Sequence, residues 1–250
     1  MTLAGAAPRL WVTRAQPGAS ATAARLSAMG LVPLVDPLLE VRPLRGGPID
    51  LAGVAALAFT SANGVTAFAG RSADRDLPVF TVGAATAAAA QRAGFIRVTS
   101  AEGDVEHLAP VIASGDWDRE GLVLAPGPVE AAGNLAGALG ALGVRARRLV
   151  VYDTVQRAPE TGTLAALHDL AGVLVHSPKA GKALAAVLTG HPAPAMTAYC
   201  LSANVAAPLR PARTNGGLAA VLTASAPTEA DLLALVTSSR VGIHGRPGPD

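Results

Sequence analysis

A junction between a short apolar strand and a helix of small residues occurs twice in this chain and constrains its fold more than any other feature. The first copy is Phe59-Thr60-Ser61-Ala62-Asn63-Gly64-Val65, and the second is Val175-His176-Ser177-Pro178-Lys179-Ala180-Gly181. In each copy an apolar run typical of a buried parallel strand ends near a serine, a good N-cap residue for the helix that follows. Such a junction presents unpaired backbone N–H groups and the positive end of a helix dipole. Both junctions are therefore candidate sites for an anion.

The junctions belong to a longer internal repeat. At offsets of about 115 residues, the strand and helix of residues 10–30 resemble those of 122–143, and residues 82–86 match 201–205. Short strands alternate with helices throughout, which predicts βαβ units and parallel sheets. The expected strands are residues 10–13, 31–35, 54–59, 78–82, 96–98, 122–124, 144–155, 172–175, 196–201 and 218–222. So many strands favour two α/β domains over one.

Two parts of the chain depart from this alternation. Residues 36–44 hold an extended stretch between Pro37 and Pro43, which is typical of a crossover rather than a core element. Residues after about Thr237 carry Gly, Pro and Arg without periodicity, and we expect them to be a frayed tail.

Composition excludes several classes of function. The net charge is only +2, Lys and Arg form no stripe, and aromatic residues make up 3% of the chain, which argues against nucleic-acid binding. No apolar run reaches about 18 residues and no signal peptide is evident, so we expect a cytoplasmic protein that does not enter a membrane. Cys200 is the only cysteine, which excludes an internal disulfide and predicts a small buried strand residue. No segment stands out as an exposed apolar patch, so a monomer is expected.

Metal and nucleotide sites have little support. The histidines at 107, 168, 176, 191 and 244 show neither HxxxH nor HExxH spacing, so no metal site is predicted. No GxGxxG fingerprint, Walker loop or GxSxG elbow is present, so no nucleotide cofactor or serine-hydrolase chemistry is expected.

The remaining candidates lie in loops at strand ends, where open α/β sheets bind ligands. Arg14 could clamp a carboxylate or be a surface charge, Tyr152 could reach a cleft or be half-buried in a strand, and Lys179 could contact an anion or be a solvated charge. Each Ser, Thr or Asn could instead only cap the next helix. The substrate-binding candidates are Arg14, Thr60, Ser61, Asn63, Gly83, Gly127, His176, Ser177, Lys179, Ser202 and Asn204.

With these residues assembled, the chain resembles the uroporphyrinogen-III synthase family from about residue 10 to 236. The resemblance rests on the order and spacing of several short motifs, none of which is diagnostic alone. They are Val-Thr-Arg at 12–14, Phe-Thr-Ser at 59–61, Val-Gly-x-Ala-Thr-Ala at 82–87, Val-Tyr-x-Thr-Val at 151–155, Ser-Pro at 177–178 and the late segment 226–233 with its Pro-Thr.

The resemblance implies a fold of two parallel-sheet α/β domains, Rossmann- or flavodoxin-like, joined by a two-stranded linker. The first domain would be discontinuous, with residues 1–36 and 157–250, and the second would hold residues 45–148. Residues 37–44 and 149–156 would be the crossover strands. The internal repeat would then be a circularly permuted duplication.

The resemblance also implies a lyase that cyclises hydroxymethylbilane with inversion of ring D and loss of water, in tetrapyrrole biosynthesis and without metal or cofactor. Tyr152 matches the family tyrosine that assists the leaving hydroxyl, and Thr86 matches a threonine of the facing loop. These two residues are the catalytic candidates. The expected partners are the carboxylate-rich linear tetrapyrrole and, transiently, hydroxymethylbilane synthase.

One loop departs from the family pattern. The family usually reads Gly-x-Thr-Thr-Ala where this chain has Ser202-Ala203-Asn204-Val205-Ala206, and a valine side chain cannot donate a hydrogen bond. This departure favours the alternative hypothesis, a non-catalytic two-lobed binding or sensor module of the same fold for a carboxylated small molecule.

Overall fold

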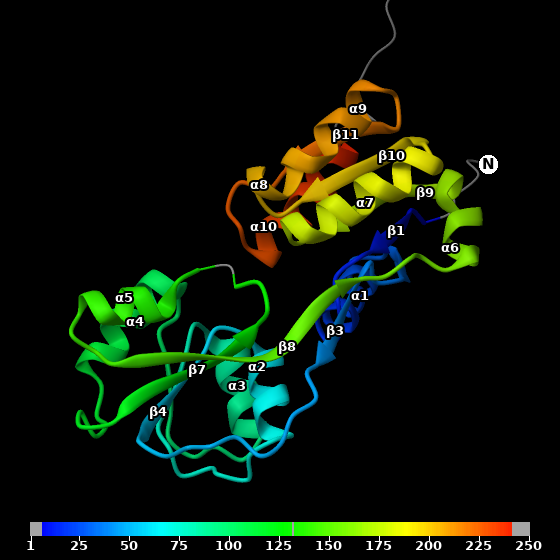
Figure 1. Cartoon of the computed structure of the whole chain (residues 1–250). Coiled ribbons are helices and arrows are strands. Elements are labelled where there is room, and N and C mark those ends of the chain that lie inside the picture. The colour runs from blue at the N-terminus through cyan, green and yellow to red at the C-terminus, as the bar shows by residue number, and fades with distance from the viewer. Residues whose placement is uncertain (1–6, 132, 242–250) are drawn as a thin grey trace, which may run out of the picture. The chain divides into compact units, whose positions relative to one another are not determined.

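The computed structural model describes residues 7–131 and 133–241. The chain divides into two compact units (Figure 1). Unit 1 is Met1–Glu40 with Val155–Asp250, and unit 2 is Val41–Thr154. The chain passes between them within strands β3 (Leu39–Pro43) and β8 (Ala146–Gln156).

Unit 1 is built on a five-stranded sheet in the order β11-β10-β9-β1-β2, with every neighbouring pair parallel. Its strands are β1 (Arg9–Val12), β2 (Val32–Val35), β9 (Leu170–Val175), β10 (Ala193–Cys200) and β11 (Leu218–Thr223). Its helices are α1 (Gly18–Ala28), α6 (Thr161–Ala165), α7 (Pro178–Gly190), α8 (Ala203–Ala206), α9 (Arg210–Thr214) and α10 (Glu229–Val241), with 3-10 turns η1 (Leu167–Asp169) and η2 (Ala207–Leu209).

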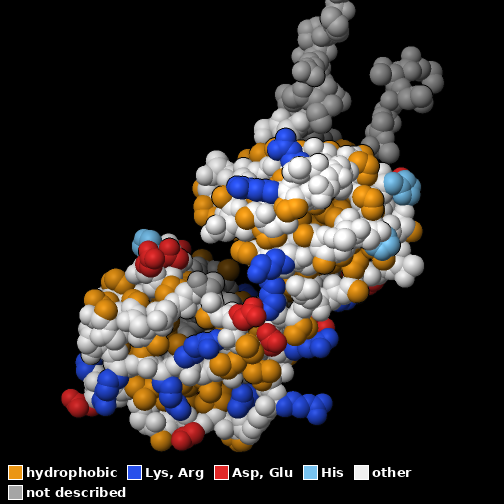
Figure 2. All heavy atoms as spheres, turned by 45° about the horizontal axis from the view of Figure 1, so that its top comes forward, with side chains coloured by type: hydrophobic (Ala, Val, Ile, Leu, Met, Phe, Trp, Pro, Cys, Tyr) orange, Lys and Arg blue, Asp and Glu red, His pale blue; other side chains and the backbone are white. Residues whose placement is uncertain are grey.

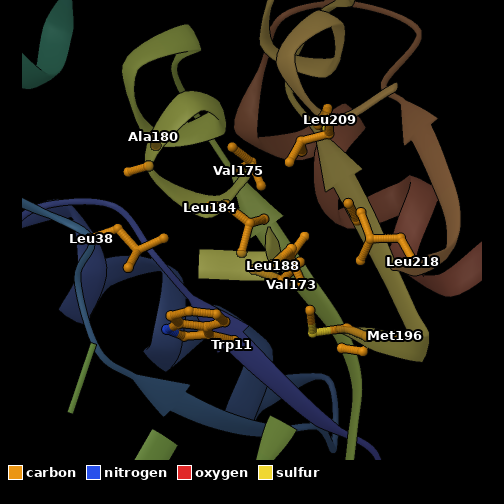
Figure 3. Close-up of a cluster of buried hydrophobic side chains, with 14 of the residues drawn as sticks. Trp11, Leu38, Val173, Val175, Ala180, Leu184, Leu188, Met196, Leu209 and Leu218 are labelled. Atoms are coloured by element: carbon orange, nitrogen blue, oxygen red, sulfur yellow. The ribbon is translucent and has the colours of Figure 1, made fainter. Parts of the chain in front are cut away.

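Both faces of this sheet are covered, because alternate residues of its strands enter different cores. Trp11 and Val173 join Leu184 of α7 in one core (Figure 3), together with Leu38 from the segment after β2. Leu10, Val12 and Leu174 join residues of α1 and α10 in the other. Burial on both faces explains the near-continuous apolar runs of these strands. Cys200 belongs to the first core and is fully buried, which confirms the prediction for it.

Unit 2 is built on a six-stranded sheet in the order β3-β8-β7-β4-β5-β6. Its further strands are β4 (Val54–Phe59), β5 (Val79–Thr81), β6 (Val98–Ser100) and β7 (Leu122–Pro128), and its helices are α2 (Ala62–Ala69), α3 (Ala84–Arg92), α4 (Val105–Ser114) and α5 (Leu135–Ala141). Side chains of α4 and α5 pack with Ala56 and Ala58 in one core. Phe59, Phe68 and Phe95 pack together in the other, with ring centroids 5.7 to 6.2 Å apart.

The two sheets share one strand order, as the repeat predicts. The repeat matches β9, β10 and β11 to β4, β5 and β6, and it matches β1 and β2 to β7 and β8. With these matches the unit 1 order becomes β6-β5-β4-β7-β8, which is the order found in unit 2. The matching strands follow one another differently along the chain, so the duplication is circularly permuted. Strand β3 is the addition at the edge of the second sheet.

The segment that leaves unit 1 is more integrated than the predicted crossover. Leu38 and Leu39 are buried, and β3 pairs with β8. The bonds from Leu44 N to Val151 O and from Arg157 N to Leu38 O show that the two strands run antiparallel.

Asp36 anchors the start of this segment. Its side chain is 2% exposed and accepts hydrogen bonds from Arg157 Nη1 at 2.9 Å and from the backbone N–H of Glu160 at 2.7 Å. Its carbonyl oxygen accepts a bond from the indole of Trp11 at 2.7 Å. This stretch carries the chain from one unit to the other, as a crossover does, but its first residues depart from the prediction: Asp36 is buried, and Leu38 and Leu39 pack in a core of unit 1.

Two other boundary predictions are corrected. The strand predicted at residues 96–98 is β6, Val98–Ser100, because Val98 pairs with Val79, while Ile96 is 80% exposed. The tail predicted after Thr237 continues as helix α10 to Val241, and residues 242–250 lie outside the described part of the chain. Ser239 lies 2.9 Å from the hydroxyl of Tyr199, which ties this last turn to β10.

Lys and Arg side chains are spread among uncharged ones on the face of each unit that Figure 2 shows. Within residues 7–131 and 133–241, no helix has the length and apolar character needed to cross a bilayer.

Candidate active site

In unit 2 the strand–helix junction brings two hydroxyl groups together. Ser61 follows β4, caps α2 and accepts a hydrogen bond from the backbone N–H of Gly64 at 3.2 Å. The Ser61 hydroxyl lies 2.9 Å from the hydroxyl of Tyr152. Tyr152 stands on β8 opposite Pro128, is 4% exposed and packs against Ala67 of α2. Burial raises the pKa of the Tyr152 phenol above its ordinary value, and the hydrogen bond with Ser61 opposes that shift. The phenol is therefore neutral at pH 7 and able to donate its proton.

Gly64 lets this junction form. A Cβ at Gly64 would lie 2.9 Å from the carbonyl oxygen of Pro126 on β7, closer than side chains pack. The first turn of α2 therefore approaches the end of β7, whose neighbour in the sheet is β8. This close packing sets the position of the capping serine relative to Tyr152.

A cavity of about 260 Å³ lies at the same carboxyl edge of the sheet, on the side of α4 and α5. Side chains alternate along β4, so Ala58 and Thr60 face this cavity while Phe59 and Ser61 lie on the α2 side. Gly127 lines the cavity as well, and a Cβ there would stand in open space, so the glycine leaves room for a ligand.

The polar side chains at the rim of the cavity are already hydrogen-bonded to nearby backbone groups. Asp104 caps α4 and accepts bonds from the N–H groups of Glu106 and His107, and Asn134 caps α5. The hydrogen bond with the His107 ring lowers the pKa of Asp104. Arg148 donates to the carbonyl oxygen of Pro128 and to that of Val129, which is 2.6 Å from its Nη2. The cavity thus offers mainly backbone groups and small side chains to a ligand.

The other unit 2 candidates stand at the starts of α2 and α3 and make none of the contacts described above. Asn63 is in the first turn of α2, and Gly83 precedes α3 at the end of β5 with open space beside it. Thr86 is in the first turn of α3 and is 6% exposed. It does not line the cavity described above.

In unit 1 the strand ends meet in an ion-pair cluster. Arg14, after β1, donates to Glu229 Oε2 at 3.0 Å, and the His176 Nε2, after β9, lies 3.0 Å from the same oxygen. Thr22 Oγ1 donates to Glu229 Oε1 at 2.6 Å. The carboxylate that Arg14 holds is therefore one of the chain's own.

The electrostatics of this cluster favour the ionised carboxylate. Burial by itself would raise the pKa of Glu229, but hydrogen bonds from His176 and Thr22 and the charges of His176 and Arg14 outweigh it and lower the pKa to about 2. The imidazole of His176 is 8% exposed, and its Nδ1 is buried without a hydrogen-bond partner. The sequence patterns did not single out Glu229. Its position at the start of the helix after β11, another strand end of the same sheet, could have indicated it.

The remaining unit 1 candidates stand at the ends of β9 and β10. Ser177 caps α7 and accepts a bond from the N–H of Ala180 at 3.1 Å, and Lys179 is in the first turn of that helix. Ser202 precedes the short helix α8 and makes no side-chain cap bond, and Asn204 lies exposed within α8. The structure thus places these candidates at neighbouring strand ends without joining them in a single contact.

Comparison with known proteins assigns the family. A profile of the family described as Uroporphyrinogen-III synthase HemD matches residues 20–234, most of the chain. The chain belongs to the uroporphyrinogen-III synthase family. No curated protein sequence matches this chain closely enough to count as a relative.

A solved structure of this family shares the fold. The uroporphyrinogen-III synthetase of Helicobacter pylori 26695 is 19% identical, with a TM-score of 0.64 over 94% of this chain and 100% of that one. A mutant uroporphyrinogen III synthase of the extremely thermophilic bacterium Thermus thermophilus is 16% identical, with a TM-score of 0.48 over 94% of this chain and 100% of that one. The first of these supports the two-sheet α/β architecture described above.

Within residues 7–131 and 133–241, no group of three or more His, Cys, Asp or Glu side chains is arranged to hold a metal ion. Burial in the core of unit 1 raises the pKa of the Cys200 thiol to about 12, so this thiol is protonated and unreactive at pH 7.

Proposed function

We propose that this protein is a lyase that converts hydroxymethylbilane into uroporphyrinogen III, closing the ring with inversion of ring D and loss of water. Membership of the family supports this reaction, and one observation in the structure carries the chemistry: the buried, neutral Tyr152 phenol held 2.9 Å from Ser61 at the end of β4.

The phenol supplies the proton that the first step needs. The bond between the hydroxymethyl carbon and its oxygen breaks, and the oxygen takes the proton of Tyr152 and leaves as water. The lone pair of the pyrrole nitrogen stabilises the cation that remains. Inversion then requires that the already substituted α-carbon of ring D attacks this cation and that the bond from this carbon to the bridge toward ring C breaks, which leaves a second pyrrole-stabilised cation on that bridge. The free α-carbon of ring D attacks the second cation and closes the ring. As ring D regains its aromaticity, the proton released from that carbon restores the phenol. The protein is thus regenerated, and the only loss is one molecule of water.

The remaining site candidates would hold the substrate in a reactive geometry. The substrate carries acetate and propionate groups on every ring, which suit backbone N–H groups and hydroxyls at strand ends. In unit 2 we assign this role to Thr60, Asn63, Gly83 and Gly127, with Thr86 as a second catalytic candidate. In unit 1 we assign it to Ser202, Asn204 and Lys179.

In unit 1 the Arg14–Glu229–His176 cluster would shape the strand ends rather than bind a substrate carboxylate directly, because the carboxylate of Glu229 already occupies Nη1 of Arg14. We further propose a monomer working in the cytoplasm and receiving its unstable substrate from hydroxymethylbilane synthase in a transient encounter.

A coupled assay tests the reaction. The protein is supplied with freshly generated hydroxymethylbilane, the product is oxidised, and the uroporphyrin isomers are separated by chromatography. The uncatalysed ring closure proceeds without inversion and gives isomer I, so a predominance of isomer III supports the proposal. Isomer I alone, from folded protein, would overturn it and leave the non-catalytic binding module as the function of this fold.

A further inference from the structure

The Ser61 hydroxyl is placed to act on Tyr152 as well as on α2. Its oxygen has two lone pairs and one proton, and the N–H of Gly64 uses one lone pair. The Tyr152 hydroxyl is 2.9 Å away, and either hydroxyl can donate in that contact. Among the residues that the structure describes, Ser61 is the side chain that hydrogen-bonds this phenol.

We propose that Ser61 is a positioning residue for the reaction, holding the phenol oxygen of Tyr152 and donating its own proton to that oxygen while Tyr152 gives its proton to the leaving hydroxyl. Ser61 keeps its proton throughout, so the balance of the step is unchanged. This inference rests on the proposed function of Tyr152.

The surroundings of Tyr152 make such a donor necessary. It belongs to a cluster with Ala67 and Val151, against which Val41, Ile49 and Leu149 pack, and these residues offer no polar side-chain atoms to a developing phenolate. A buried anion without a donor is costly, whereas a hydrogen bond to a charged group is among the stronger ones. The N–H of Gly64 and the positive end of α2 draw electron density from the Ser61 oxygen, which makes its proton a better donor.

Capping and positioning can be separated in the protein itself. Ser177 caps α7 with the same geometry, through the N–H of Ala180 at 3.1 Å, and no hydrogen bond joins its hydroxyl to a tyrosine in the described part of the chain. A serine cap therefore needs no phenol, and the contact at Ser61 is an additional feature of unit 2.

Three substitutions separate the two roles. Ser61→Thr keeps both the cap and the donor, and we expect near-normal activity. Ser61→Asp keeps a good cap, but its carboxylate accepts hydrogen bonds and cannot donate to a phenolate. Ser61→Ala loses both. We expect kcat for isomer III to fall about tenfold or more in the Asp and Ala variants, with KM nearly unchanged, as for a lost hydrogen bond to a charged group.

A double-mutant cycle with Tyr152→Phe decides whether the effect passes through Tyr152. We expect Ser61→Ala to add almost nothing to the loss already caused by Tyr152→Phe. Equal losses in both backgrounds would show that Ser61 only caps the helix, and full activity in the Asp variant would show that donation is not needed. Either result overturns the inference.

Ultraviolet titration gives a readout that does not depend on turnover. The chain has two tyrosines, so in a Tyr199→Phe background the phenolate signal comes from Tyr152 alone. Because the bond with Ser61 lowers the pKa of Tyr152, we expect Ser61→Ala and Ser61→Asp to raise it and Ser61→Thr to leave it in place. An unchanged titration in the Ala variant overturns the inference. If the parent protein forms no isomer III while the titration shifts as expected, the proposed function fails and the contact between Ser61 and Tyr152 stands.

Discussion

The Ser61 and Ser177 junctions share one construction and differ in what surrounds it. Each serine ends a parallel strand and accepts a bond from a backbone N–H three residues on. Each also lies close to a glycine that is packed against a carbonyl oxygen, Gly64 against Pro126 and Gly181 against Val205. The serine and the glycine at each junction therefore meet a shared structural need, which is to bring a helix N-terminus close to neighbouring backbone: the end of β7 at Gly64 and helix α8 at Gly181.

What differs is whether the polar groups nearby are already satisfied. At the unit 1 junction, Glu229 takes bonds from Arg14, His176 and Thr22, so the charges pair within the chain. At the unit 2 junction the serine meets a phenol that is buried and neutral, and a cavity lined by small residues lies at the same edge of the sheet on its other side. We infer that one repeat unit keeps a strand end available for chemistry while the other uses the matching end for stability.

Tyr152→Phe gives the largest effect expected from this difference. Removing the proton donor should lower kcat for isomer III about a hundredfold with little change in KM, the usual size of a general-acid contribution. Tyr199→Phe is the matched control, since Tyr199 is also buried and hydrogen-bonded, to Ser239, but belongs to the core of unit 1. A Tyr152→Phe protein with the parent rate would remove Tyr152 from the chemistry while leaving the family assignment intact.

Glu229→Gln tests the structural role of the unit 1 cluster. The folded pKa of Glu229, about 2, lies below its ordinary value of 4.5, so the unfolded chain binds more protons between these values. The carboxylate therefore stabilises the fold above about pH 4.5, and this stabilisation is lost as the pH falls toward 2. Its size is about 2 kcal/mol at pH 7 once partial solvent access is allowed for.

Denaturant titrations at several pH values measure this effect. The Gln variant should be less stable at pH 7 and should lose less stability than the parent between pH 5 and pH 2, while Glu120→Gln, at an exposed site, should follow the parent. Parallel curves for Glu229→Gln and the parent would show that the cluster contributes no such stability.

Gly64→Ala and Gly181→Ala sharpen the comparison further. Alanine favours a helix, but the new methyl carbon would lie 2.9 Å from Pro126 O in the first variant and 2.7 Å from Val205 O in the second. We expect each to cost about 1–2 kcal/mol of stability, because the helix must move away from the carbonyl oxygen that it packs against. Only Gly64→Ala should also lower the rate, since it shifts Ser61 away from Tyr152. Equal rate losses in both variants would contradict that link.

Sequence patterns predicted much of the fold and less of the site, because patterns report local physics. Strand–helix alternation, the N-caps and the permuted repeat follow from short segments, and the strand order of both sheets agrees with them. Contacts between distant residues leave no such pattern, as with Arg14 and Glu229, which are 215 positions apart. The same limit applies to Ser61 and Tyr152, 91 positions apart.

Boundary errors have a similar origin. Ile96 is apolar, which predicts a strand residue, yet its side chain is exposed and pairing with β5 starts at Val98. The last turn of α10 contains Thr237, Ser238 and Ser239, a weak helical signal. Their hydroxyls bond back to carbonyl oxygens one turn earlier, and Ser239 also meets Tyr199 on β10. Tertiary contact thus extends a helix that propensity alone would end.

Ser177→Ala has the smallest effect and isolates capping by itself. Loss of the bond from the N–H of Ala180 should cost about 1 kcal/mol of stability, the usual value for a serine N-cap. In a Tyr199→Phe background it should leave the titration of Tyr152 unchanged, because the bond that it removes is made within unit 1. A shift in that titration would mean that the two junctions are coupled, and the division between a stabilising and a reactive junction would no longer hold.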